Sequence, residues 1–214
     1  MSPKARTVLL AGATGLVGRH CLDELLADPG VARVVAPTRR PLGVTHPKLD
    51  NPVVDFDALE KALEGRTFDQ AICCLGTTIK QAGSREAFRR VDHDYPLALG
   101  RAARAGGATH YLVVTALGSD ERSLFFYNRV KGEVERGLRE LGFGALTIVR
   151  PSLLVGERSD LRFGERIATP FGRLLPAKWK AVDGSTVAKA LRALAAEDAK
   201  GTRIVESAEL QRYA

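Results

Sequence analysis

The chain has 214 residues, of which 45% are hydrophobic and 27% are charged, and its formal net charge is +7 at pH 7. This composition is typical of a globular protein and excludes an intrinsically disordered chain. The length suits one hydrophobic core, so we expect a single domain spanning residues 1–214. No apolar run approaches the roughly 20 residues that cross a bilayer, and we expect no membrane span.

The first six residues lack the apolar stretch of a secretory signal, which makes a cytoplasmic location the expectation. The positive charge raises the question of a nucleic-acid partner. The arginines are scattered, however, and no basic run is interleaved with aromatic residues, so we expect none. The charge is either a solvated basic surface or attracts an anionic ligand such as a phosphorylated dinucleotide.

Three cysteines are too few for a disulfide framework, and we expect all three to be reduced, buried thiols. Cys73 and Cys74 are neighbours in a strand-like run, so their side chains should point to opposite faces of a sheet. The cysteine spacings match no zinc pattern, and the histidines lie far apart in the sequence. We therefore expect no metal site.

Short apolar runs alternate with segments of helical periodicity, which predicts an α/β fold with a doubly wound parallel sheet of the Rossmann type. In chain order, strands are expected at residues 7–10, 33–36, 52–54, 70–75, 110–115, 145–149 and 203–205. Helices are expected to begin near Leu16, Asp57, Ser84, Leu97, Leu124 and Ser185. The least regular segment, Ser159 to Asp183, follows the sixth strand and predicts a small C-terminal insertion on the substrate side.

The first turn of the chain carries a glycine motif, Gly12-Ala13-Thr14-Gly15-Leu16-Val17-Gly18. Glycines at three-residue intervals let the backbone turn tightly and approach a pyrophosphate, whose charge is favoured by the unpaired N–H groups of a helix N-terminus. Because the motif lies between a strand and a helix, it predicts dinucleotide binding rather than a purely structural turn. The expected binding residues are Gly12, Thr14, Gly15, Leu16, Val17 and Gly18.

The end of the second strand indicates which dinucleotide binds. A site that prefers NAD carries an acidic residue there, about twenty residues past the loop, to bind the ribose hydroxyls. This chain has Pro37-Thr38-Arg39-Arg40 instead. Arg39 and Arg40 would stabilise a 2′-phosphate through charge-assisted hydrogen bonds, so NADP(H) is expected, the alternative being two surface arginines in a loop.

Three further residues are expected at the cofactor edge of the sheet. Asp55 follows the third strand, and it either accepts a hydrogen bond from the adenine amino group or caps a turn or helix. Leu75 and Gly76 close the fourth strand at the same edge.

Tyr127-Asn128-Arg129-Val130-Lys131 places a phenol and an ammonium four residues apart, on one face of an expected helix. A phenol with a pKa of roughly 10 is a poor base at neutral pH, and a nearby ammonium favours its ionised form. We therefore expect Lys131 to activate Tyr127 and to bond the nicotinamide ribose. Thr115, at the carboxyl end of the fifth strand, is expected to bond a substrate carbonyl or hydroxyl, with Ser119 as the alternative. The structural alternatives are an ordinary helix-surface pair and a threonine that only packs.

Together these motifs resemble those of the atypical short-chain dehydrogenase/reductases, and within them the Tat-interacting oxidoreductase branch. The resemblance covers nearly the whole chain and rests on residues 12–18, 38–40, 53–56, 73–78, 91–95, 127–135 and 150–151. It implies that NADPH is bound by the loop and the arginine pair, and that Arg162 reaches the cofactor. Thr115-Ala116 departs from the serine pair common in such proteins. The chain after Pro151 is too short to enclose a sugar nucleotide, so the epimerase or dehydratase label often attached to such chains is not expected here.

The expectation is an NADPH-dependent oxidoreductase acting on a small carbonyl or hydroxyl substrate. The alternative is an NADP(H)-binding sensor or regulatory protein that binds a protein partner without turnover. One fold supports many functions, so the resemblance alone does not decide between them. The intact pair of Tyr127 and Lys131 favours the enzyme.

Overall fold

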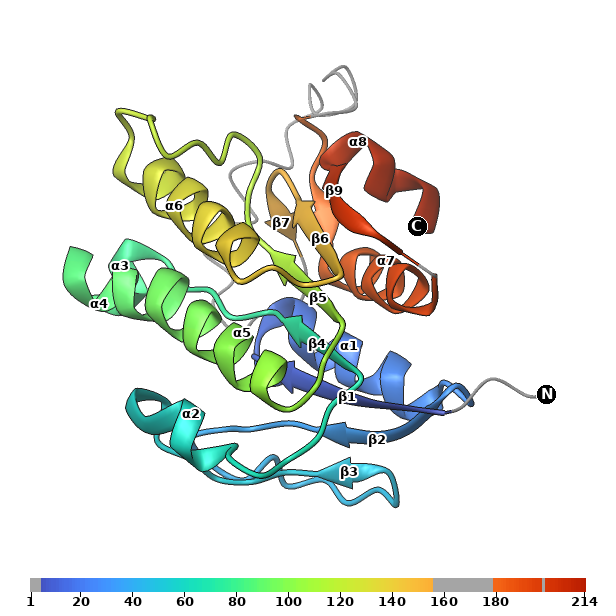
Figure 1. Cartoon of the computed structure of the whole chain (residues 1–214). Coiled ribbons are helices and arrows are strands. Elements are labelled where there is room, and N and C mark those ends of the chain that lie inside the picture. The colour runs from blue at the N-terminus through green and yellow to red at the C-terminus, as the bar shows by residue number, and fades with distance from the viewer. Residues whose placement is uncertain (1–4, 156–178, 198) are drawn as a thin grey trace.

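The structure is a computed structural model that describes residues 5–155, 179–197 and 199–214. Within them, parallel strands form a seven-stranded sheet in the order β3-β2-β1-β4-β5-β6-β9 (Figure 1). The strands are β1 (Arg6–Ala11), β2 (Val31–Val35), β3 (Leu49–Asp50), β4 (Gln70–Cys73), β5 (His110–Val114), β6 (Ala145–Arg150) and β9 (Gly201–Glu206). The strand order reverses between β1 and β4, which confirms the expected doubly wound Rossmann-type sheet.

Helices cover both faces of this sheet (Figure 1). One layer consists of α1 (Leu16–Ala27) and α7 (Gly184–Ala196). The other consists of α2 (Leu59–Ala62), α5 (Tyr95–Ala105) and α6 (Phe126–Glu140). The shorter helices are η1 (Phe56–Ala58), α3 (Ile79–Ala82), α4 (Arg85–Arg89), α8 (Ser207–Leu210) and η5 (Gln211–Tyr213).

The alternation of side chains along β1 builds a core on each face of the sheet. Val8 and Leu10 pack in the cluster under α1 and α7, whereas Leu9 and Ala11 pack in the cluster under α5 and α6. All four are buried. A strand buried on both faces is typical of the centre of a parallel sheet, and β1 therefore positions the loop that follows it.

The three cysteines are free thiols in the structure. Cys73 is buried in the cluster under α5 and α6, and Cys74 packs against the cluster on the opposite face, as the alternation predicted. Cys21 is buried, but Cys74 is only partly so, which corrects the expectation that all three are buried. Burial raises the pKa of Cys73 to about 11, so this thiol stays protonated.

The predicted third strand and the predicted helix start at Leu97 both differ from the structure. The third strand was expected at residues 52–54 but is formed by Leu49–Asp50 (β3). Beyond it, Val53 forms only an isolated bridge with Thr38. Asn51 explains the shift, because its side-chain amide donates hydrogen bonds to the Ala36 carbonyl (2.6 Å) and to Thr38 Oγ1 (2.8 Å). The helix expected from Leu97 begins earlier, because a π-helical turn at Arg90–Asp94 joins α4 directly to α5.

The segment expected to form the small insertion lies mostly outside the described residues. On either side of it, β7 (Leu154–Val155) and β8 (Val182–Asp183) pair in parallel as a separate two-stranded sheet. Arg162, which the resemblance assigns to the cofactor, also lies outside the described residues.

Candidate functional site at the carboxyl edge of the sheet

The glycine loop joins β1 to α1 next to the point where the strand order reverses. Gly12 has a φ of +87°, and a Cβ at this position would lie 2.6 Å from the carbonyl carbon of Cys74. A Cβ on Gly18 would lie only 1.9 Å from the Gly12 carbonyl oxygen. Both positions therefore exclude any larger residue, because the loop is in close contact with β4 on one side and α1 on the other.

The first turn of α1 offers backbone N–H groups at this edge. Gly15 is the N-cap residue, and no side chain caps the helix. The side chain of Val17 is buried in the core, and that of Leu16 lies against Gly184, so these two residues can contact a ligand through their backbone. Thr14 is exposed beside them. An uncapped helix N-terminus favours an anion, so this loop fits the pyrophosphate of a dinucleotide.

Arg39 and Arg40 lie exposed beyond the end of β2. Thr38 holds their loop in place, because its hydroxyl donates a hydrogen bond to the Arg40 carbonyl oxygen (2.7 Å). Its backbone also pairs with Pro52 and Val54 on the neighbouring segment. Among the residues that the structure describes, neither guanidinium has a carboxylate partner. The two charges are therefore available to an anionic ligand.

The other residues expected at the cofactor edge have distinct surroundings. Asp55 Oδ1 accepts a hydrogen bond from a backbone N–H two residues on (2.9 Å) and caps η1, while its adenine contact stays a prediction. Leu75 packs, partly buried, against the core under α5 and α6. Gly76 lies beside Asp92 and Lys131: a Cβ built on it would be 3.6 Å from Asp92 Oδ1 and 3.9 Å from Lys131 Nζ. Gly76 thus connects the cofactor edge to the predicted catalytic lysine.

Lys131 projects from α6 into a buried ion pair. Its Nζ lies 2.8 Å from Asp92 Oδ1, and the two side chains are 5% and 1% exposed. The other carboxylate oxygen of Asp92 accepts a hydrogen bond from the Thr77 N–H (2.9 Å). Burial by itself would lower the pKa of Lys131, but the carboxylate of Asp92, together with Tyr127 in its ionised form, outweighs burial and raises it. Lys131 is therefore a firmly charged ammonium at neutral pH.

Tyr127 lies one helical turn before Lys131 and is 36% exposed. Its ring packs against Phe88 of α4, with the ring centroids 5.6 Å apart. Within the described part of the chain, its hydroxyl has no hydrogen-bond partner. The ring is thus held in place while the phenol remains accessible to a substrate.

Sequence reasoning did not assign a role to Asp92. It lies in the π-helical turn Arg90–Asp94, and such turns are frequent at functional sites. The only signal in the sequence was its place in the motif at residues 91–95. Burial raises the pKa of Asp92, against the lowering effect of Lys131 and of the Thr77 N–H. The contact joins two helices, so no local pattern could have indicated it.

The two hydroxyls considered for substrate binding are engaged within the chain. Thr115 Oγ1 donates a hydrogen bond to Glu135 Oε1 (2.8 Å). Glu135 is buried and accepts two further bonds from Arg150, at 2.9 and 2.5 Å. Ser119 Oγ donates to the Ala116 carbonyl oxygen (2.7 Å). Glu135 was also missed from the sequence, and the substrate-binding role of Thr115 stays a prediction.

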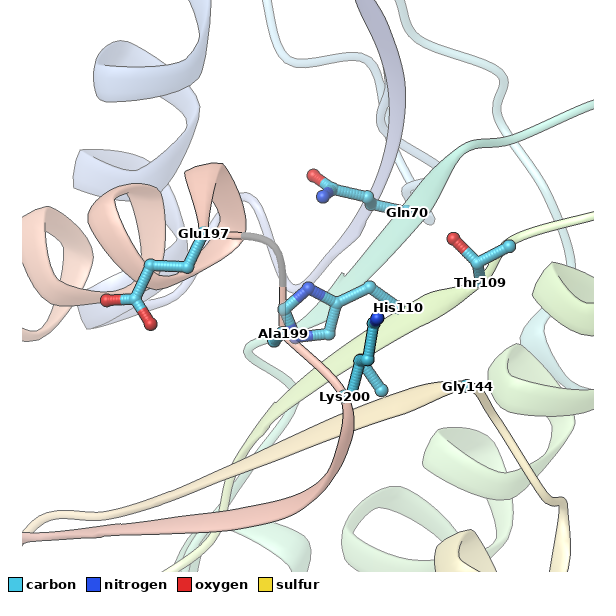
Figure 2. A pocket seen from close by; sticks show the side chains of 8 residues that line it. Gln70, Thr109, His110, Gly144, Glu197, Ala199 and Lys200 are labelled. Carbon is cyan, nitrogen blue, oxygen red and sulfur yellow. The ribbon is translucent and has the colours of Figure 1, made fainter.

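A cavity of about 270 Å³ opens at the opposite edge of the sheet (Figure 2). Gln70, His110 and Lys200 line it, at the amino ends of β4, β5 and β9. Burial and the charge of Arg6 lower the pKa of His110 to about 4, so its imidazole is neutral. One ring nitrogen pairs with the Thr147 hydroxyl (2.8 Å). Because the glycine loop, the arginine pair and Lys131 all lie at the carboxyl edge, we place the functional site there.

The described residues contain neither a metal-binding cluster nor a membrane-spanning helix. They contain no group of three or more histidine, cysteine, aspartate or glutamate side chains placed to hold a metal ion. None of the helices in the described ranges combines the length and apolarity needed to cross a membrane.

A family model described as NAD(P)H-binding matches residues 12–198. The chain belongs to this NAD(P)H-binding family. The chain is similar to "Protein HTATIP2" of Rattus norvegicus, with 36% identity over 195 residues that cover 88% of this chain and 79% of the relative. "Protein FMP52, mitochondrial" of Eremothecium gossypii is 33% identical over 212 residues, covering 94% of each. These matches confirm the resemblance to the Tat-interacting branch.

Solved structures share the fold of this NAD(P)H-binding protein at low identity. "MoeE5 in complex with UDP-glucuronic acid and NAD" aligns with a TM-score of 0.72 and 21% identity, covering 92% of this chain and 75% of that one. The oxidoreductase ylbE from Lactococcus lactis aligns with a TM-score of 0.67 and 17% identity, covering 96% and 95%. At these identities the likeness establishes the Rossmann-type fold alone.

The comparisons contradict the expected cytoplasmic location. The fungal relatives from Eremothecium gossypii and Emericella nidulans are both named mitochondrial proteins. The expectation was drawn from the lack of a secretory signal, and that lack does not distinguish the cytoplasm from an organelle.

Proposed function

We propose that this NAD(P)H-binding protein is an NADPH-dependent oxidoreductase that interconverts a carbonyl and a hydroxyl group. The observation that carries the proposal is the pair on α6, in which the buried ammonium of Lys131 lies one turn from the accessible phenol of Tyr127. Gly76, in the segment that follows β4, lies close to the same ammonium. The pair is thus adjacent to the edge where the glycine loop lies.

Two positively polarised features of the proposed site, the N-terminus of α1 and the arginine pair after β2, indicate which cofactor would bind. Residues 12–18 would hold the pyrophosphate at the N-terminus of α1, and Arg39 and Arg40 would hold a 2′-phosphate. A guanidinium binds phosphate through charge-assisted and often bidentate hydrogen bonds, whereas a carboxylate in that place would repel it. The lack of carboxylate partners for either arginine among the described residues supports NADPH. When bound, NADPH supplies the hydride.

The protein's own groups supply the proton. Tyr127 donates its phenolic proton to the carbonyl oxygen as the carbonyl carbon accepts the hydride, so the product is an alcohol. The phenolate left on Tyr127 is stabilised by the ammonium of Lys131. Asp92 holds that ammonium in the buried site, and an ammonium has three N–H donors, so Lys131 can also bond the nicotinamide ribose.

The test is NADPH oxidation by the protein against a broad panel of carbonyl compounds. Tyr127→Phe removes only the hydroxyl, so turnover should fall by roughly 10²- to 10⁴-fold with little change in NADPH affinity. Lys131→Met should lower both turnover and NADPH affinity. Tyr213→Phe, at the C-terminal η5, is the matched control and should behave as the wild type. Unchanged turnover in Tyr127→Phe would remove Tyr127 from the mechanism.

A second function, an NADP(H)-binding sensor without turnover, is favoured by one observation. Thr115 and Ser119 each donate their hydroxyl proton to an acceptor within the chain, so neither hydroxyl is free to bind a carbonyl. A sensor would bind NADPH but oxidise it with no member of the panel. In that case the wild type and Tyr127→Phe would both show no NADPH oxidation in the assay.

A further inference from the structure

Exposed hydrophobic side chains lie on the segments that follow β4, β5 and β6. Leu124 is 94% exposed and Phe125 is 76% exposed, and both immediately precede α6. Ile79 follows β4 and Leu153 follows β6, with exposures of 40% and 42%. We call these four residues the apolar rim. Because parallel strands end at a common edge, the apolar rim lies on the same edge as Tyr127.

Two hydrogen bonds connect the loop after β5 to the segment after β6 and to the first turn of α6, which carries Tyr127. The Leu117 N–H donates to the Pro151 carbonyl oxygen (2.8 Å), which joins the loop after β5 to the segment that carries Leu153. Asn128 Nδ2 donates to the Gly118 carbonyl oxygen (2.8 Å), which joins the same loop to the first turn of α6. The segment after β4 approaches Lys131 through Gly76, as described above.

Other side chains pack on Phe126, whereas its two neighbours Leu124 and Phe125 are exposed. Phe126 packs on Phe88 at a centroid distance of 5.8 Å, and the guanidinium of Arg85 lies 5.1 Å from its ring centroid. Leu124 and Phe125 have no such cover among the described residues. Leaving a leucine and a phenylalanine in water is unfavourable, and a ligand that covers them recovers that free energy.

Building on the proposed function, we propose that the substrate is a lipophilic carbonyl compound, an aldehyde or ketone with an extended hydrocarbon part. The hydrocarbon part covers Leu124 and Phe125, and the carbonyl group meets the Tyr127 hydroxyl two residues further on. The carbonyl carbon gains the hydride and its oxygen gains the phenolic proton, while the hydrocarbon part is unchanged. The apolar rim then determines specificity and takes no part in the chemistry.

The experiment uses the n-alkanals from propanal to decanal with NADPH. Each methylene that becomes covered should raise kcat/KM by roughly fourfold, until the chain extends past the apolar rim. Leu124→Ser and Phe125→Ser should each lower the ratio of kcat/KM for the longest and shortest alkanals by roughly tenfold. Ile204→Thr, an exposed position on the outer strand β9, is the control and should keep the wild-type ratio.

The possible failures are distinguishable. Turnover of all alkanals without a dependence on length overturns the lipophilic substrate and leaves the proposed function intact. Lack of turnover with every carbonyl overturns the proposed function. The lipophilic site is then tested separately by titrating the NADPH-loaded protein with the matching alkan-1-ols. The Kd must fall with alcohol length in the wild type and must not do so in the serine variants. The inference is also overturned if the kcat/KM and Kd of the wild type do not depend on chain length while a serine variant changes the sedimentation coefficient. That result would assign the apolar rim to contact with a second copy of the chain.

Discussion

Replacing Asp92 with asparagine should destabilise the protein far more than an ordinary surface substitution. Asp92→Asn keeps the shape of the side chain and an acceptor for the Thr77 N–H, but it removes the charge that faces Lys131. The pair is 2.8 Å apart and almost fully buried, so solvent screens its attraction only weakly. Removing one partner of such a pair costs about 3–5 kcal/mol, which in a chain of this length corresponds to a fall in Tm of roughly 6–20 °C.

The free energy of unfolding is measured by urea denaturation at pH 7. The control is Glu60→Gln, which breaks the half-exposed ion pair with Arg101 (2.8 Å) and should cost less than about 1 kcal/mol. The double variant Asp92→Asn/Lys131→Met leaves no unpaired charge and should recover part of the loss. If Asp92→Asn costs no more than Glu60→Gln, the buried pair does not hold Lys131, and our reasoning about the site is refuted.

Three further predictions concern the cofactor site and the opposite edge of the sheet. Arg39→Ala or Arg40→Ala should weaken NADPH binding by roughly 10- to 100-fold and leave NADH binding nearly unchanged in fluorescence titrations, whereas equal losses for both cofactors would contradict the assignment. Gly18→Ala places a Cβ 1.9 Å from the Gly12 carbonyl oxygen, so α1 must shift, and calorimetry should show weaker binding of both cofactors together with a lower Tm. The folded-state pKa of His110, about 4, lies below its ordinary value of 6.5, so its contribution to stability is fully present above pH 6.5 and is lost as the pH falls toward 4. Urea unfolding at several pH values should show a loss of roughly 3 kcal/mol across this range that His110→Gln removes, and an unchanged slope in the variant would disprove the assignment.

Features set by neighbouring residues were predictable from the sequence. The glycine spacing and the preceding strand placed the start of α1 at Leu16, where the structure has it. The helix expected to begin near Leu124 begins two residues later, at Phe126. Leu124 and Phe125 are exposed, so at this point hydrophobicity does not report on burial.

Contacts between distant elements were not predictable in the same way. The four-residue spacing of Tyr127 and Lys131 indicated a pair on one helix face, but it did not indicate that Asp92 on another helix neutralises the lysine. Thr115 was interpreted as a ligand-binding hydroxyl from its place at a strand end. Its partner is the buried carboxylate of Glu135, and only the packing of α6 against the sheet brings the two together.

The π-helical turn between α4 and α5 amounts to one surplus residue in an otherwise continuous helix. Each residue of an α-helix turns the chain by about 100° and advances it by roughly 1.5 Å. Deleting one residue from 90–94 would restore regular helical hydrogen bonding but rotate α4 by that angle relative to α5. Phe88 would then swing away from the Tyr127 ring, and the Asp92 carboxylate would lose its alignment with Lys131. A shorter and more regular helix would thus be a poorer support for the phenol and the ammonium, so a single-residue deletion here should be harder to tolerate than most substitutions in the same turn.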